Sequence, residues 1–221
     1  MRGNPMDFLL YILENQEQWL ELLSQHVQLT LLSILLGIVI ALPLAVIASR
    51  VEVLAKPMTW VASLGQTVPS LAVLALALPL LGIGFVPSLV ALTIRAILPI
   101  FLNPYIGIKT ADRAAVDAAR GMGTSDLQLL LLVELPLASP VLFAGIQTAT
   151  VQNIGLATLA AYIGGGGLGD LILQGLAMFN PPILLAGAVP IALLAMLTEI
   201  AMSRLRRLVV PTGLDVVRGD R

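Results

Sequence analysis

Residues 117–136 read DAARGMGTSDLQLLLLVELP, a polar, glycine-containing stretch that carries charges of both signs. Long apolar blocks precede and follow it. A block of about 20 apolar residues is long enough to cross the hydrocarbon core of a bilayer as a helix. The stretch is therefore predicted to connect two membrane spans outside the hydrocarbon, where water can solvate its charges.

The composition of the whole chain is that of a membrane protein. Of its 221 residues, 58% are hydrophobic and only 11% are charged, whereas a soluble domain carries about a quarter charged residues. The formal net charge of −1 argues against nucleic acid as a partner, and the absence of cysteine excludes disulfides and thiolate metal sites. Because acidic residues precede the first apolar block, we expect no cleavable signal peptide.

The apolar blocks predict an all-α polytopic membrane protein with about five spans. They run from Val27 to Ala48, Met58 to Leu81, Val86 to Ile108, Pro136 to Ile163 and Ile183 to Met202. Pro69 and Pro79 should bend the second span. Residues 1–25 place apolar residues at helical spacing among acidic ones, which predicts an amphipathic helix at the membrane surface. We divide the chain into this segment, a transmembrane domain (26–203) with a polar loop (109–134), and a polar tail (204–221).

The distribution of basic residues predicts the orientation. Five spans put the short loop at 50–56, the polar loop and the tail on one side of the membrane. That side holds ten Lys and Arg residues: Arg50, Lys56, Lys109, Arg113, Arg120, Arg204, Arg206, Arg207, Arg218 and Arg221. The opposite side holds only Arg2. By the positive-inside rule, the N-terminus is outside, and the polar loop and the C-terminus are cytoplasmic.

The polar loop itself is predicted to form a helix, a glycine-containing turn and a second short helix. Residues 114–120 are rich in strong helix formers. Gly121 and Gly123 then loosen the backbone, and Thr124 or Ser125 can cap the helix that follows. The richness in Ala and Gly alone fits an ordinary solvated loop equally well.

The spacing of residues 117–136 closely resembles the EAA loop of bacterial ABC-importer permeases. That loop reads Glu-Ala-Ala, three residues, Gly, nine residues, Ile, one residue and Leu-Pro. Asp117-Ala118-Ala119, Gly123 and Val133-x-Leu135-Pro136 stand at these positions, with Asp for Glu and Val for Ile. The resemblance implies a coupling helix that docks on a partner ATPase. The residues that it assigns to coupling are Asp117, Ala118, Ala119, Gly121, Gly123, Thr124, Leu135 and Pro136.

Four further stretches resemble osmoprotectant permeases, which share the five-span, MetI-like core of type I importers in the bacterial inner membrane. They are HVQLTL from His26, TVPSLA from Thr67, Leu98-Pro99-Ile100 with Asn103, and ATLAAYIGGGGLGDL from Ala157 to Leu171. The resemblance implies cargo such as glycine betaine, choline, carnitine or related quaternary amines. Methionine-importer permeases share the GGLG-like stretch and the chain length, so methionine or another small solute stays open as cargo.

The family also implies partners. They are two ATPase subunits inside, an extracytoplasmic solute-binding protein, and a second permease chain that is identical or different. ATP would be used by the partner ATPase, so we expect no cofactor, catalytic residue or metal on this chain. Quaternary amines are usually recognised by aromatic cages, whereas only 5% of these residues are aromatic and they are scattered. That favours cargo selection by the separate binding protein.

Arg95 is the most unusual single residue, because it lies within the third span. It is about nine residues from the outer end, or roughly 13 Å deep at about 1.5 Å per residue. An intramembrane charge is a candidate functional residue. A structural Arg that bonds carbonyls freed near Pro99, or that snorkels to the interface, fits equally well. Similar permeases tend to have Tyr here, so the resemblance assigns no role.

Other polar residues at membrane depth are candidates to line a passage. Thr148, Gln152 and Gly155 share one helical face of the fourth span. Such a face suits either a passage or helix–helix packing through small, hydrogen-bonding residues. The complete set of candidates is Thr67, Ser70, Arg95, Asn103, Thr148, Gln152 and Asn153.

Two features carry no chemistry in this interpretation. The run GGGGLG at 164–169 lacks the Lys-Ser/Thr of a P-loop and is expected near the outer surface, as a flexible or tightly packed span end. His26 has no ligand-spaced partner and is interpreted as an interfacial polar residue.

Two other classes of function remain. An ion-gradient-driven transporter would show internal repeats or acidic relays, which we do not find; Glu199 sits near the inner end of span five. A non-transporting membrane scaffold is the third.

Overall fold

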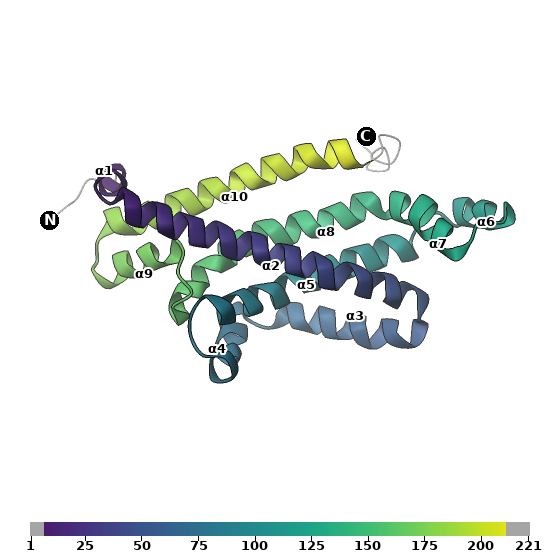
Figure 1. Cartoon of the computed structure of the whole chain (residues 1–221), viewed down its shortest axis with the longest axis horizontal. Coiled ribbons are helices and arrows are strands. Elements are labelled where there is room, and N and C mark those ends of the chain that lie inside the picture. Colours follow the sequence, from purple (N-terminus) through teal and green to yellow (C-terminus); the bar gives the residue numbers. More distant parts are fainter. Residues whose placement is uncertain (1–6, 211–221) are drawn as a thin grey trace.

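The computed structural model describes residues 7–210, and every regular element in this range is a helix (Figure 1). Four helical stretches are long and apolar enough to cross a membrane: α2 (Gln16–Arg50), α5 (Phe85–Lys109), the stretch Asp126–Ile163 and α10 (Pro181–Val209). A bent pair, α3 (Glu52–Thr67) and α4 (Ser70–Leu81), makes the fifth. The predicted all-α polytopic fold with about five spans is confirmed. Arg2, Arg218 and Arg221 lie outside the described residues.

The long helices run along one axis, whereas α4 lies across it (Figure 1). In Figure 1, α1 (Asp7–Glu14) and the start of α10 lie at one end, and α6 (Arg113–Gly121) and α7 (Asp126–Leu129) lie at the other. We refer to these as the α1 end and the α6 end. The predicted polar loop therefore stands clear of the bundle at a single end.

The N-terminal segment packs on the protein itself. The helix of the first span begins at Gln16, eleven residues before the predicted span start at Val27, and it follows directly on α1. Phe8, Tyr11 and Trp19 pack on a core cluster that includes Ile183 of α10. The indole N–H of Trp19 also donates to the Ala186 carbonyl at 3.0 Å. Part of the predicted apolar face thus packs on the bundle, whereas Leu9, Leu10 and Leu13 are exposed, and the helix at the membrane surface stays a prediction.

The second span is broken where a proline predicts a bend. α3 ends at Thr67, α4 begins at Ser70, and their axes differ by 104°. Val68, which precedes Pro69, is extended, because the proline ring disfavours helical backbone at the residue before it. Pro79 lies inside α4, which continues to Leu81.

α5 is the central helix, and small residues bring its neighbours close to it. A Cβ built on Gly37 of α2 would lie 3.0 Å from the Cβ of Ala96, and one on Gly145 would lie 2.7 Å from the Cβ of Asn103. Without a hydrophobic driving force between helices in lipid, such close backbone approach is a principal source of packing energy. The core cluster between α2, α5 and α8 (Leu135–Leu156) is correspondingly rich in alanine.

The fourth span is assembled from several helix types. α7 continues through a π-helical turn, η1 (Leu130–Glu134), into α8, and α8 ends in a 3-10 helix, η2 (Ala157–Ile163). The glycine run follows. The predicted connecting region 168–182 then contains a further short helix, α9 (Gly169–Ala177), which packs on α10.

Candidate functional site

The coupling segment, α6 to η1, has the helix–turn–helix form that its sequence predicts. The Asp112 side chain caps α6 by accepting from the Ala114 N–H at 2.8 Å. Ser125 and Gln128 form a reciprocal capping box at the start of α7. Between the two helices Gly123 has φ +84°, a left-handed backbone that favours glycine. Of the two predicted caps, Ser125 is the one used.

Four of the eight residues assigned to coupling by resemblance are open to a partner. Asp117, Ala118, Gly121 and Gly123 are exposed, and nothing lies within 4 Å of a Cβ built on either glycine. Ala119 differs, because it is only 3% exposed and packs inward.

Two further contacts fix the turn and its continuation. The Thr124 hydroxyl donates to the Ala119 carbonyl at 2.8 Å, so Thr124 holds the turn closed. Leu135 and Pro136 are half-buried at the start of α8. The coupling role of all these residues stays a prediction.

An ion pair attaches this segment to the first span. Arg50, the last residue of α2, donates through Nη1 to Glu134 Oε1 at 3.0 Å and through Nη2 to Glu134 Oε2. Glu134 is the last residue of η1, and its side chain is 6% exposed against 33% for Arg50. The pair lies in a groove of about 900 Å³ between the coupling segment and the ends of α2 and α5. The sequence patterns did not predict this contact. The available signal was Glu134, the single charged residue in the run LLLLVELP.

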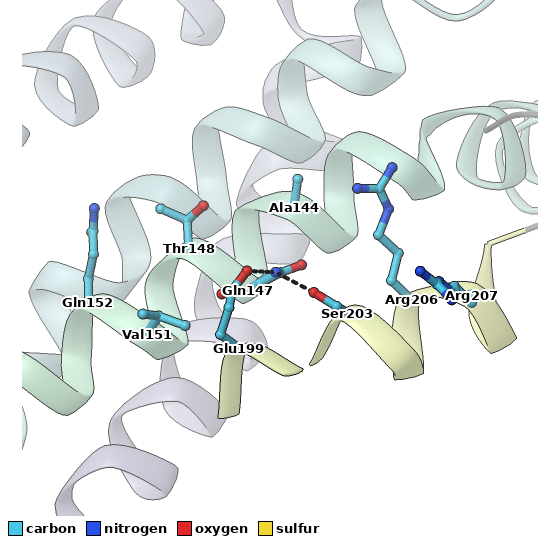
Figure 2. A pocket seen from close by; sticks show the side chains of 9 residues that line it. All are labelled: Ala144, Gln147, Thr148, Val151, Gln152, Glu199, Ser203, Arg206 and Arg207. Atoms are coloured by element: carbon cyan, nitrogen blue, oxygen red, sulfur yellow. Dashed lines mark hydrogen bonds between the residues drawn. The ribbon is translucent and has the colours of Figure 1, made fainter. Parts of the chain in front are cut away.

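A second groove, of about 800 Å³, runs between α8 and α10 (Figure 2). Gln147 bridges its two walls: its Nε2 donates to Glu199 Oε1 at 2.6 Å and to Ser203 Oγ at 3.4 Å. Gln152 lies at one end of the groove and Arg206 and Arg207 at the other. We call it the α8–α10 groove. An apolar helix pair in lipid would not place these polar groups on its surface, so this face suits water or another protein.

The predicted polar face of the fourth span is present. Asn153, the other candidate on this span, is buried and does not belong to that face. Thr148, Gln152 and Gly155 are exposed, and the first two line the α8–α10 groove. Asn153 is 1% exposed instead. Its Nδ2 donates to Ser33 Oγ at 2.9 Å and to the Leu92 carbonyl at 3.1 Å, which ties α8 to both α2 and α5.

The remaining path candidates lie in two other places. Arg95 Nη1 donates to the carbonyls of Gly65 and Val68 at 3.1 and 3.2 Å, so the carbonyls that it binds are those of the broken second span and not those near Pro99. Its buried Nε has no partner among the described residues. Thr67 and Ser70 flank the same break. Asn103 is half-buried on α5 and donates to the Pro99 carbonyl at 2.9 Å.

The glycine run and His26 pack together at the α1 end. A Cβ on Gly165 or on Gly166 would lie 2.1 Å from Ser88 Oγ or Gln25 Oε1, so the run is tightly packed. His26 is fully buried, with Nε2 2.9 Å from the Ile154 carbonyl, so the interpretation of His26 as an interfacial residue was wrong. Within residues 7–210, no three His, Cys, Asp or Glu side chains are grouped to hold a metal ion.

Comparison with known protein families identifies the family of this chain. The model of a family described as "Binding-protein-dependent transport system inner membrane component" matches residues 33–211. The chain belongs to this family. It is therefore a multi-pass inner-membrane permease subunit of an ABC importer, as the EAA-like spacing implied.

Curated relatives cover nearly the whole permease. It is 41% identical to the choline transport system permease protein OpuBB of Bacillus subtilis, over 86% of this chain and 88% of that protein. It is 42% identical to the glycine betaine/carnitine/choline permease OpuCB of the same organism, over 87% and 88%. It is 38% identical to the osmoprotectant import permease protein OsmW of Salmonella typhimurium, over 95% and 100%. These relatives are transport permeases and not enzymes.

The solved structures confirm the MetI-like fold. A chain of the MetNI methionine ABC transporter, in a study of its inward-facing conformations, aligns with a TM-score of 0.83 at 21% identity. The alignment covers 90% of this permease and 99% of that chain. An amino acid ABC transporter aligns with a TM-score of 0.73 at 18% identity. At these identities the likeness concerns the fold alone.

Proposed function

We propose that this permease moves osmoprotectants such as glycine betaine, choline, carnitine or related quaternary amines into the cell. The observation that carries the proposal is the near full-length similarity, at about 40% identity, to permeases named for this cargo. Methionine is the weaker candidate, because the methionine transporter shares the fold at 21% identity only.

The drive for transport comes from partner ATPase subunits through the coupling segment. The exposed surface of α6 and its turn stands clear of the bundle, and the capping contacts and the Arg50–Glu134 pair hold it rigid. The excess of Lys and Arg on the α6 end supports an orientation in which this end is cytoplasmic and the N-terminus is outside. ATP binds to the ATPase, and no cofactor is required on this chain.

The passage for cargo lies between two permease chains, with the α8–α10 groove as part of its wall. Polar exposed residues on apolar helices support this placement, because they are costly against lipid. An extracytoplasmic binding protein selects and delivers cargo. The groove offers scattered polar groups and no enclosed pocket, which suits a low-affinity path from which cargo can leave.

Reconstitution tests the proposal directly. The permease is placed in proteoliposomes with its ATPase subunits and binding protein, and accumulation of labelled glycine betaine, choline, carnitine and methionine is measured with and without ATP. We expect ATP-dependent accumulation of at least one quaternary amine and none of methionine. Import of methionine alone would overturn the cargo assignment. Accumulation driven by an ion gradient without ATPase would overturn the coupling assignment, and unchanged uptake in cells that lack the chain would favour a scaffold.

A further inference from the structure

Among residues 7–210, Glu199 is the one acidic side chain that lines the α8–α10 groove. The 18 residues from Pro181 to Thr198 carry no charge, so Glu199 is the first ionisable group along α10. At about 1.5 Å per residue it lies roughly 27 Å from the start of the helix. This depth corresponds to the α6 end of a hydrocarbon core of about 30 Å. An exposed carboxylate here faces the groove together with Gln147 and Ser203 (Figure 2).

A neutral side chain is the hydrogen-bond partner of the Glu199 carboxylate. Gln147, a neutral amide, donates the hydrogen bond to its Oε1. Within residues 7–210, no ion pair includes Glu199. The basic side chains of the same groove, Arg206 and Arg207, follow seven and eight residues later, about 10–12 Å farther along the helix. Water and salt in the groove weaken the effect of these two charges on a cation near Glu199, since the Debye length is about 8 Å at physiological ionic strength.

A quaternary ammonium can be recognised in only a few ways. It has no N–H to donate, so it is held either by the faces of aromatic rings or by a negative charge. The residues that line the α8–α10 groove include no aromatic side chain. The carboxylate of Glu199 is therefore the group in this groove that can attract such a cation.

We propose that Glu199 is the cation-selecting residue of the passage, which draws the positively charged end of cargo along the α8–α10 groove. The identity of the cargo rests on the proposed function, but the attraction of a cation to the groove does not. The field of Glu199 favours choline, a net cation, over glycine betaine, whose carboxylate is repelled while its ammonium is attracted. For unit charges about 4–5 Å apart in a water-like medium, this attraction corresponds to about a fivefold change.

Thiol labelling measures this attraction without cargo, ATP or receptor. The chain has no cysteine, so Ser203→Cys places a single thiol one helical turn from Glu199. The full-length chain, reconstituted in lipid, is treated with a trimethylammonium-ethyl or a sulfonato-ethyl methanethiosulfonate. The ratio of the two labelling rates reports the local potential. Any change in the thiolate fraction affects both rates equally and cancels in this ratio.

The expected result is specific to the charge. Glu199→Gln in the Ser203→Cys background slows labelling by the cation and speeds labelling by the anion, so their ratio should fall by the square of the fivefold factor, about 25-fold, whereas Glu199→Asp keeps it within about twofold. Glu52→Gln, which removes an exposed carboxylate at the start of α3, leaves the ratio unchanged. A ratio that is unaffected by Glu199→Gln, or that falls equally with Glu52→Gln, overturns the proposal. Should the Gln variant fold poorly, raising the salt concentration on the Ser203→Cys chain tests the same attraction, because salt screens the charge and should lower the ratio.

Import by the complete transporter separates this inference from the proposed function. With ATPase and binding protein present, Glu199→Gln should lower choline import about fivefold more than glycine betaine import. Equal loss for both, with an unchanged labelling ratio, contradicts a selective role for Glu199. Import of neither compound by the unmodified transporter contradicts the proposed cargo instead, and the labelling result then still decides whether the groove attracts cations.

Discussion

Arg50 and Glu134 lie 84 residues apart in the chain and form a two-point ion pair that joins the end of α2 to the start of α8. The charge of Arg50 is also placed favourably for its own helix, because a cation is stabilised at a helix C-terminus. The pair sits where the coupling segment enters the bundle. Movement of that segment should therefore reach α2 as well as α8.

The ion pair predicts an asymmetric cost of mutation. Arg50→Gln leaves the buried Glu134 carboxylate without a partner and should cost about 2–3 kcal/mol, less than in a fully buried pair because Arg50 is partly exposed. Glu134→Gln should cost less, since Arg50 can turn toward solvent. Thermal denaturation of the purified permease measures both, with the exposed Arg113→Gln as the control. If the stability losses of the two single variants add up to that of the double variant, the two side chains are not coupled.

Arg95 predicts the second effect, at the broken span. Arg95→Met removes the donor from the carbonyls of Gly65 and Val68, which should cost about 1–3 kcal/mol locally. Hydrogen exchange of the amides at 64–73 should accelerate, while Arg95→Lys, which retains a cationic donor, should show a smaller change. Ile94→Met on the exposed neighbouring position is the control. Unchanged exchange in Arg95→Met would mean that the hydrogen bonds of Arg95 do not stabilise the broken second span.

The coupling turn predicts the third effect, and the chain contains a matched control for backbone strain. Gly123 and Gly164 both have left-handed φ, +84° and +69°, and nothing lies within 4 Å of a Cβ built on either. Ala at either position should cost about 1–2 kcal/mol of strain. Only Gly123→Ala should also lower the amount of ATPase that co-purifies with the permease. Equal ATPase retention in the two variants would remove Gly123 from the coupling surface.

Sequence patterns anticipate the features that depend on local chemistry. Apolar length marks the spans, Pro69 marks the break in the second span, and Thr124 or Ser125 marks the start of α7. The polar face of Thr148 and Gln152 follows from helical spacing alone. These features need only a few neighbouring residues, so no tertiary information is required to infer them.

Features that depend on how the helices pack against one another are the ones that could not be predicted. His26 was placed at an interface because the first span was expected to begin at Val27, whereas α2 begins at Gln16 and carries His26 into the bundle. The partner of Arg95 comes from α3, 30 residues earlier. The Arg50–Glu134 pair likewise depends on the axial register of α2 against α8, which no local pattern specifies.

Asn153 and Gln152 provide the fourth prediction, because they are neighbours in sequence with opposite environments. Asn153→Leu removes the hydrogen bonds to Ser33 and the Leu92 carbonyl and should destabilise the permease by about 2–3 kcal/mol. Gln152→Leu changes an exposed side chain of the α8–α10 groove and should alter stability by no more than about 0.5 kcal/mol. Thermal denaturation compares the two. If Asn153→Leu melted normally and instead impaired import alone, then Asn153 would belong to the passage and its buried position would not persist through the transport cycle.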